Sequence, residues 1–336
     1  MRVLAAPDKF RGTATAAEAA AAIGHACWEL GHDVDEAPLS DGGEGLLDVL
    51  GGPTRTTTVT GPLGRPVDAA WRFRRDTAVI EMARASGLLL AGGAEGNDPL
   101  RASTIGTGEL LDRALDLGAT RIVVGLGGSA TTDGGLGALE AIHVPARLRS
   151  VELRVACDVR TRFTDAAEVF GPQKGASPAQ VALLTGRLQR LAQRYLADHG
   201  VDVDVIEGSG AAGGLGGALA ALGGELLSGF ELVADEVDLH DRLALADAVV
   251  TGEGHLDAQS LDGKVVGGVC ELAANAGVPV LVIAGDTDAD VAAELRSRRV
   301  DVVSLVEDFG EERARSQVRT SIETVAGRWL AERAPG

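Results

Sequence analysis

The 336-residue chain has little lysine, cysteine or aromatic content. Aromatic side chains make up 3% of it, so alanine, valine, leucine and glycine must do most of the packing. Its three cysteines, Cys27, Cys157 and Cys270, stand far apart, which argues against a disulfide framework or a zinc site. No apolar run approaches the roughly 18 residues that a membrane helix needs. The N-terminal residues lack the apolar core of a signal peptide, so we expect a cytoplasmic protein with no membrane partner.

Net positive charge is also absent. The formal net charge is -18, which argues against nucleic acid as a partner because phosphate backbones require a basic surface. The 45% hydrophobic and 24% charged content is ordinary for globular proteins, and the length suffices for two domains. An acidic protein can still bind a small anion in a local cationic pocket.

The few lysines are placed informatively. Only three of the 31 basic residues are lysine, and each stands in a short loop with glycine nearby: Lys9 in P-D-K-F-R-G, Lys174 in G-P-Q-K-G-A and Lys264 in D-G-K-V. A compact ammonium group beside a glycine loop suits phosphate binding. These positions are therefore candidate anion contacts.

The two ends of the chain alternate strand and helix patterns, whereas the middle is mixed. Strands are expected at 3–6, 34–39, 248–250, 280–284 and 302–306, and helices at 15–30, 265–276, 288–298 and 311–330. In the middle, 55–60 and 71–82 look like antiparallel strands, 122–124, 151–156 and 201–206 like further strands, and 46–50, 109–117 and 178–199 like helices.

This pattern predicts an α/β fold with two domains. A doubly wound parallel-sheet domain, Rossmann- or flavodoxin-like, would combine residues 1–52 and 240–336, with a mixed α/β domain of residues 53–239 inserted. Polar loops at the strand ends would then line an active site in a cleft between the domains.

The glycine-rich stretch 125–135, G-L-G-G-S-A-T-T-D-G-G, directly follows an apolar run. The amides of Gly127 and Gly128 and the hydroxyls of Ser129 and Thr131 could bind a phosphate. Asp133 could hold Mg²⁺ or a substrate hydroxyl. A glycine-rich turn without a ligand is the alternative interpretation.

Other motifs are weak or absent. Residues 208–213, G-S-G-A-A-G, match the dinucleotide pattern G-x-G-x-x-G, so an NAD-dependent oxidoreductase stays open as an alternative. No P-loop motif or hydrolase elbow occurs, and the histidines show no metal-ligand spacing. Carboxylates at strand ends, glycine loops and isolated cations together favour phosphoryl transfer, hence a small-molecule kinase; the strand-end carboxylates are Asp8, Asp41, Asp133, Asp158, Glu253 and Asp257.

Eight segments, in order along nearly the whole chain, resemble the bacterial type I glycerate kinases, the glycerate 2-kinase group. They are A-P-D (6–8), D-G-G-E-G (41–45), T-G-P-L-G (60–64), 125–135, A-C-D-V (156–159), F-G-P-Q-K-G-A (170–176), 210–214 and T-G-E-G (251–254) with Asp257, Gln259, Ser260 and G-K-V (263–265). The resemblance implies ATP- and Mg²⁺-dependent phosphorylation of D-glycerate, at the 2-hydroxyl, and two α/β domains with the active site between them.

The chain departs from the family pattern at three places. Lys9 and Arg11 stand where family members typically have Ser and Lys. The segment 140–151 is shorter than usual, and 160–169 replaces a glycine-containing loop. A non-catalytic glycerate-binding sensor is therefore a second alternative. The chain is expected to be a monomer or homodimer.

These considerations yield a hypothesis for each candidate site residue. Asp158 orients or deprotonates the glycerate hydroxyl, while Lys174 and Arg11 neutralise the transferring phosphate. Asp41, Glu253 and Asp257 hold Mg²⁺ or glycerate hydroxyls. The remaining candidates bind substrate or phosphate: Asp8, Lys9, Ser40, Asp41, Arg84, Thr107, Gly127, Gly128, Ser129, Thr131, Asp133, Gly210, Gly213, Gln259, Ser260 and Lys264.

Overall fold

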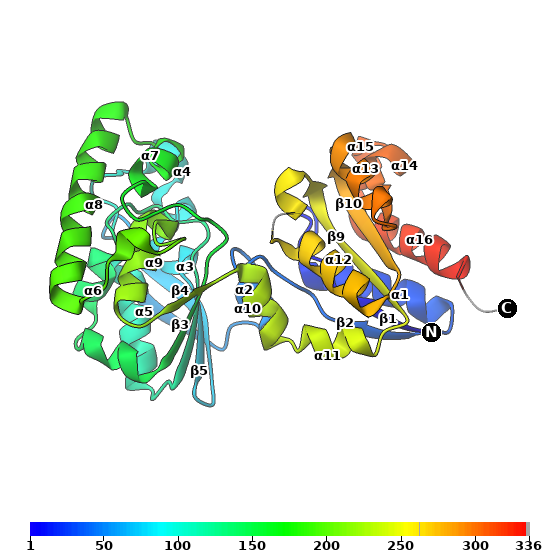
Figure 1. Cartoon of the computed structure of the whole chain (residues 1–336), viewed down its shortest axis with the longest axis horizontal. Helices are drawn as coiled ribbons and strands as arrows, with labels where there is room; N and C mark the ends of the chain where they lie inside the picture. Colours follow the sequence, from blue (N-terminus) through cyan, green and yellow to red (C-terminus); the bar gives the residue numbers. More distant parts are fainter. Residues whose placement is uncertain (262, 334–336) are drawn as a thin grey trace. The chain divides into compact units, whose positions relative to one another are not determined.

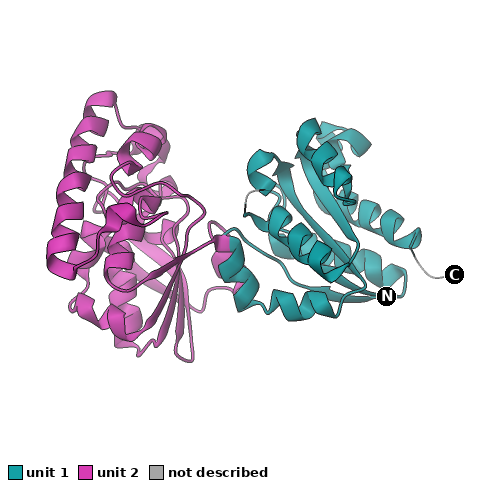
Figure 2. Ribbon diagram, viewed as in Figure 1, with its two compact units in different colours: residues 1–41, 230–336 teal, residues 42–229 magenta. Residues whose placement is uncertain are grey.

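The computed structural model describes residues 1–261 and 263–333. The chain divides into two compact units, shown in Figures 1 and 2. Unit 1 comprises residues 1–41 and 230–336, and unit 2 comprises residues 42–229. No helix among the described residues is long and apolar enough to cross a membrane.

Unit 1 is built on a five-stranded, fully parallel sheet in the order β11-β10-β9-β1-β2. The strands are β1 (Arg2–Ala5), β2 (Asp33–Glu36), β9 (Ala248–Leu256), β10 (Val280–Thr287) and β11 (Asp301–Ser304). Strands from both ends of the chain share this sheet, since β1 pairs with β9 on one side and with β2 on the other. The predicted α/β fold with a parallel sheet is confirmed.

Helices cover both faces of this sheet (Figure 1). The buried faces of α1 (Ala16–Glu29) and α16 (Val318–Ala331) form one core cluster with Val3, Ala5 and Val250. Helix α12 (Val265–Ala276) contacts β9 and β10 on the opposite face. The other helices are α10 (Gly229–Glu236), α11 (Leu239–Ala244), η5 (Ala258–Leu261), α13 (Ala289–Ser297), α14 (Leu305–Phe309) and α15 (Glu311–Ser316).

Unit 2 is built on a six-stranded mixed sheet in the order β3-β4-β5-β6-β7-β8. The strands are β3 (Arg55–Thr60), β4 (Pro66–Arg74), β5 (Thr77–Glu81), β6 (Arg121–Gly125), β7 (Glu152–Ala156) and β8 (Glu225–Leu227). The first two pairings are antiparallel and the last three are parallel. The loops after β5, β6, β7 and β8 therefore leave the same edge of the sheet.

Helix α8 (Pro178–His199) begins where the sequence indicates. The Ser177 hydroxyl accepts a hydrogen bond from the Gln180 amide, and the Gln180 side chain accepts one from the Ser177 amide. Leu184, Leu188 and Tyr195 of this helix are buried against Phe163. The remaining helices of unit 2 are α2 (Leu46–Val49), α3 (Ala83–Ser86), η1 (Leu89–Ala91), α4 (Gly93–Gly96), α5 (Ile105–Asp116), α6 (Leu136–Ala141), η2 (Pro145–Ser150), α7 (Ala166–Phe170), η3 (Pro172–Lys174), η4 (Val203–Val205) and α9 (Ala211–Ala221).

Three expected elements differ from the structure. The strand expected at 71–82 is divided between β4 and β5, because Arg75 adopts a left-handed φ of 59° and the chain reverses there. The strand expected at 201–206 is instead the 3-10 turn η4, capped by the Asp202 side chain. The expected last helix is interrupted at Gln317, between α15 and α16.

The unit boundaries fall near 41 and 229 rather than the expected 52 and 239. Helix α2 belongs to unit 2 because the amides of Gly45 and Leu47 donate to the buried Glu81 carboxylate, at 3.1 and 2.8 Å. Helix α10 belongs largely to unit 1, since Phe230 packs against Gly268 of α12, where a Cβ would lie 2.1 Å from the ring.

Replacement of Leu188 by alanine tests the packing of α8. We expect Leu188→Ala to lower the free energy of unfolding by about 2–5 kcal/mol, since it leaves a cavity in a fully buried cluster. Leu183→Ala is the control: this side chain is exposed on the same helix, and its loss should change stability by less than about 0.5 kcal/mol. Urea unfolding followed by circular dichroism measures both, and equal effects would contradict the packing described.

Candidate active site

A pocket of about 550 Å³ lies in unit 1 at the carboxyl ends of its strands. Parallel α/β sheets typically bind ligands at this edge. Eight candidate residues line it: Asp8, Lys9, Arg11, Asp41, Glu253, Asp257, Ser260 and Lys264. Of the other two candidates in unit 1, Ser40 is buried and Gln259 is exposed, with its amide bonded to Asp257.

Lys9 lies close to two of the four aspartates that line the pocket, Asp8 and Asp41. Its Nζ lies 3.2 Å from Asp41 Oδ1 and 3.6 Å from Asp8 Oδ1. Burial raises the pKa of Asp8 to about 6, with a further increase from the Asp41 charge and an opposing effect from Lys9. Burial acts to lower the pKa of Lys9, but the two carboxylates outweigh it and raise that pKa. Lys9 therefore stays cationic and compensates two acids.

Glu253 is a partly buried acid of the pocket. Its Oε1 is buried and has no hydrogen-bond partner among the described residues. Burial raises the pKa of Glu253 to about 7, aided by repulsion from Asp8 and Asp257 and opposed by Ser260 and Lys264. An orphaned carboxylate oxygen in a polar pocket is a place where a cation or a substrate hydroxyl can bind.

Asp257 has a more fixed environment. Its Oδ1 accepts hydrogen bonds from the amides of Gln259 and Ser260, at 2.8 and 3.1 Å. These bonds hold the loop after β9 in place. The donor set of Asp41, Glu253 and Asp257 consists of carboxylate oxygens, which suits Mg²⁺. Within the described residues, however, these three do not form a cluster with all ligand atoms inside 4.8 Å. Mg²⁺ commonly keeps several waters and binds only one or two carboxylates, so the set still fits this ion.

In unit 2, the candidate loop 126–135 follows β6 and packs backbone to backbone against two other loops. A Cβ on Gly127 would lie 2.8 Å from Gly43 Cα, and one on Gly213 would lie 2.0 Å from the Thr131 carbonyl oxygen. Gly213 also has a left-handed φ of 67°. Only glycine fits at such a contact. The pattern G-x-G-x-x-G at 208–213 thus serves loop packing, and α9 contains left-handed residues at 212–214 instead of beginning as a regular helix.

Asp133 organises this loop. Its Oδ2 accepts hydrogen bonds from the Thr104 amide and hydroxyl, at 2.8 and 2.9 Å, and from the Ser103 hydroxyl at 3.3 Å. Its carboxylate also accepts bonds from the amides of Gly135 and Gly137. Because its oxygens are occupied by protein donors, the geometry favours a positioning role for Asp133 over direct contact with phosphate.

Lys174 is buried below the same loop. Only 3% of it is exposed, and its Nζ donates a 2.7 Å hydrogen bond to the Thr131 carbonyl oxygen. Burial lowers the pKa of this ammonium to about 7, and the Asp133 charge opposes the change. The Asn97 side-chain amide donates to the carbonyls of Ala130 and Lys174, which joins the two segments further. This geometry favours support of the loop over direct contact with a phosphate.

The other candidates of unit 2 have varied surroundings. Asp158 is exposed just beyond β7, and its Oδ1 accepts a 2.8 Å bond from the Gly229 amide. Arg84 donates to the buried Glu81 at 2.7 Å. Thr107 and Ser86 share a hydrogen bond between their hydroxyls, at 2.9 Å. Gly210 donates its amide to the Thr161 carbonyl. Gly128 and Ser129 lie in the loop itself, where the Gly128 carbonyl accepts from Leu88 and Ser129 pairs with Gly87.

A larger pocket, of about 690 Å³, lies beside β3 and α5 in unit 2. None of the candidate residues lines it. Three of its acids already have partners: Glu109 accepts from the Thr60 amide and hydroxyl, Asp112 bonds His143 at 2.6 Å, and Asp116 pairs with Arg147 at 2.9 Å. It also lies along a strand edge rather than at strand ends. The chemistry therefore favours the smaller pocket of unit 1.

Sequence reasoning missed several residues of the site. Asp286 lies near the carboxyl end of β10 and lines the unit 1 pocket, and its place directly after the apolar part of that strand could have revealed it. Glu311 and Arg315 reach the same pocket from α15, and no local pattern marks them. Glu81, the last residue of β5, binds the amides of Gly45 and Leu47, and a carboxylate at the end of a strand gives no hint of such partners.

Comparison with known proteins now identifies the family. The model of the glycerate kinase family matches residues 3–146 and 142–331. This chain belongs to the glycerate kinase family. It is thus a small-molecule kinase, as the sequence predicted, and membership favours this class over an NAD-dependent oxidoreductase.

Individual relatives agree over most of their length. The chain is 44% identical to an uncharacterized protein of Mycobacterium bovis, over 93% of this chain and 86% of the relative. It is 40% identical to glycerate 2-kinase of Escherichia coli K12, over 91% and 90% of the two chains. A crystal structure assigned as glycerate kinase 2 of Salmonella typhimurium LT2 superposes with a TM-score of 0.85 and 35% identity, covering all of both chains.

Glu253→Gln tests whether the unit 1 pocket penalises the charged form of the Glu253 carboxyl group. The folded-state pKa of Glu253 lies near 7, above its ordinary value, so the folded protein holds this proton more tightly than the unfolded chain does. Stability must therefore fall as pH rises through this window. In metal-free buffer we expect Glu253→Gln to match the parent at pH 5 and to be more stable at pH 8, on the order of 1–2 kcal/mol. Thermal melts between these pH values measure the difference.

The control is Glu312→Gln, which removes an exposed glutamate of α15. Its stability difference from the parent should not change with pH over this range. A Glu253→Gln protein that behaves in the same way would show that the pocket does not penalise the carboxylate.

Proposed function

We propose that this protein is a glycerate 2-kinase that transfers the γ-phosphoryl group of MgATP to the 2-hydroxyl of D-glycerate. The observation that carries the proposal is the polar pocket of unit 1, where Lys9 lies between two aspartates and one Glu253 oxygen has no hydrogen-bond partner among residues 1–261 and 263–333. Cations beside carboxylates are what phosphoryl transfer requires. The relative named glycerate 2-kinase supports the choice of hydroxyl.

In unit 1, Asp41, Glu253 and Asp257 would hold Mg²⁺, in part through water. The ion would neutralise phosphate charge as it develops. Lys9, Arg11 and Lys264 would supply further positive charge toward phosphate or carboxylate oxygens. The three cations line one pocket, so a polyanionic ligand can meet them together.

In unit 2, Asp158 would accept the proton of the substrate 2-hydroxyl. The hydroxyl oxygen forms a bond to the γ-phosphorus while the bond from that phosphorus to the bridging oxygen of ADP breaks, and the proton moves to the carboxylate. The bond from the Gly229 amide to Oδ1 fixes the orientation of Asp158. The amides of Gly127 and Gly128, together with Ser129, would donate hydrogen bonds to phosphate. Lys174 would maintain this loop through the Thr131 carbonyl.

A coupled assay of ADP release tests the function. MgATP should yield ADP when D-glycerate is added, and should yield much less with L-glycerate or with no acceptor. ADP release that does not depend on an acceptor would indicate an ATPase. Absence of release, combined with a thermal shift on adding D-glycerate, would instead support the alternative of a non-catalytic sensor.

Asp158→Asn tests the assigned base. The amide keeps the shape of the carboxyl group but cannot accept the substrate proton, so we expect kcat to fall about 100-fold or more. Its exposed position beyond β7 predicts little change in melting temperature. Asp165→Asn, at another exposed aspartate of unit 2, is the control and should keep full activity. Turnover near the parent value in Asp158→Asn would refute the assignment.

A further inference from the structure

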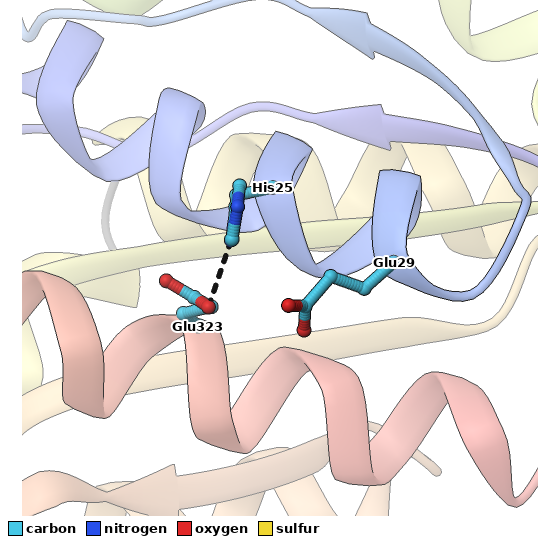
Figure 3. Close-up of side chains that lie close together, drawn as sticks. All are labelled: His25, Glu29 and Glu323. Atoms are coloured by element: carbon cyan, nitrogen blue, oxygen red, sulfur yellow. Dashed lines mark hydrogen bonds and ion pairs between the residues drawn. The ribbon is translucent and has the colours of Figure 1, made fainter.

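Three metal-ligating side chains come together on the surface of unit 1, apart from the residues of the candidate pocket (Figure 3). His25 and Glu29 stand four residues apart on α1, so they project from the same face of the helix. Glu323 reaches them from α16, and its Oε1 lies 2.8 Å from His25 Nδ1. One ligand atom from each side chain lies within 4.8 Å of the other two. No other such group of three occurs in residues 1–261 and 263–333.

The two carboxylates among these three side chains, those of Glu29 and Glu323, form a place where a cation would be favoured. Two carboxylates approach each other here, and Figure 3 shows Glu29 and Glu323 directed toward the same space between the helices. Like charges at this separation repel. The bond to Glu323 raises the pKa of His25, so a proton on the imidazole partly compensates them when no other cation is present. A divalent ion would compensate both carboxylates and use the imidazole as a neutral ligand.

The two helices hold these side chains on a rigid support. Thr15 and Glu18 form a capping box at the start of α1, and Glu18 pairs with Arg319 of α16 at 3.4 Å. Between the helices lies a buried layer that includes Ile23 and Ile322. Only the exposed ends of the ligating side chains must adjust to close around an ion. Because the ligating residues stand on helices, ion binding would require little additional ordering of the backbone.

We propose that His25, Glu29 and Glu323 form a binding site for a divalent first-row transition ion, of which Zn²⁺ is the representative. One imidazole nitrogen and two carboxylate oxygens match the ligands that zinc takes in proteins, with water in the fourth position. Imidazole disfavours Mg²⁺ and Ca²⁺, which prefer oxygen ligands alone. The site is therefore chemically distinct from the all-oxygen set of the pocket.

Such an ion would connect the two ends of the chain. Helix α1 belongs to the first 41 residues and α16 to the last part of unit 1, and unit 2 lies between them in the sequence. Binding to the folded state alone stabilises it in proportion to the logarithm of the free-ion concentration. The expected role is structural, a brace between α1 and α16.

Zinc titration of the full chain tests the proposal. A chromogenic chelator competes for Zn²⁺ in the presence of excess Mg²⁺, which occupies oxygen-only sites, and thermal melts are recorded in parallel. We expect one zinc per chain and a rise in melting temperature. Both His25→Ala and Glu323→Gln should weaken binding by about tenfold or more and abolish the thermal shift. His240→Ala, an exposed histidine of α11 in the same unit, should leave both unchanged.

Trp28 gives an independent measurement. Its indole is 74% exposed, and its ring centre lies 5.9 Å from that of His25. Cu²⁺ bound at the trio should quench its fluorescence, and Trp28→Phe should remove the quenched component. Glycerate kinase activity of the His25→Ala protein confirms that it is folded. Zinc binding of unchanged affinity in both His25→Ala and Glu323→Gln would overturn the proposal, as would the lack of a one-to-one site in the parent.

Discussion

Backbone-to-backbone contact at the strand ends is the constraint on which unit 2 depends. The 126–135 loop touches the 42–45 loop at Gly127 and the 208–214 loop at Gly213, in both places without room for a Cβ. Because glycine has no side chain, the loops touch one another through main-chain atoms at these points. Two charged side chains hold this loop further. The Asp133 carboxylate accepts a hydrogen bond from the Thr104 amide, and the Lys174 ammonium donates one to the Thr131 carbonyl oxygen. The loop is thereby held in place, and under the proposed function its glycine amides would donate hydrogen bonds to phosphate.

In unit 1 the main constraint is electrostatic, because several carboxylates lie close together where the parallel strands end. Asp8 and Glu253 both have raised pKa values, because burial penalises their charged forms. Lys9 compensates part of this charge, and within the part of the chain that the structure describes one buried Glu253 oxygen has no hydrogen-bond partner. A pocket of this kind is destabilising in the absence of ligand. It is the arrangement expected where a cation and a phosphate are to be bound together.

Much of the fold followed from local signals. Helices were predicted from residues 15 and 178, and both begin at capping boxes, formed by Thr15 and Ser177. The apolar run before the glycine-rich stretch 125–135 likewise forms the inner strand β6. The reversal at Arg75 was not predictable, because arginine at positive φ carries no sequence signal. The burial of Lys174 was missed for a similar reason: a lysine among glycines looks the same whether it faces solvent or a carbonyl. Arg315 enters the pocket from a distant helix, which only the tertiary fold reveals.

The proposed reaction places the phosphoryl group on the 2-hydroxyl of D-glycerate. Phosphorus NMR of the product formed from MgATP and D-glycerate tests it most directly. In a 2-phosphate the phosphorus couples to the single methine proton, whereas in a 3-phosphate it couples to the two methylene protons. Transfer to the 2-hydroxyl should give a new phosphomonoester signal that is a doublet in the proton-coupled spectrum. A triplet would place the phosphate on the other hydroxyl, and the absence of any ester would contradict the proposed reaction.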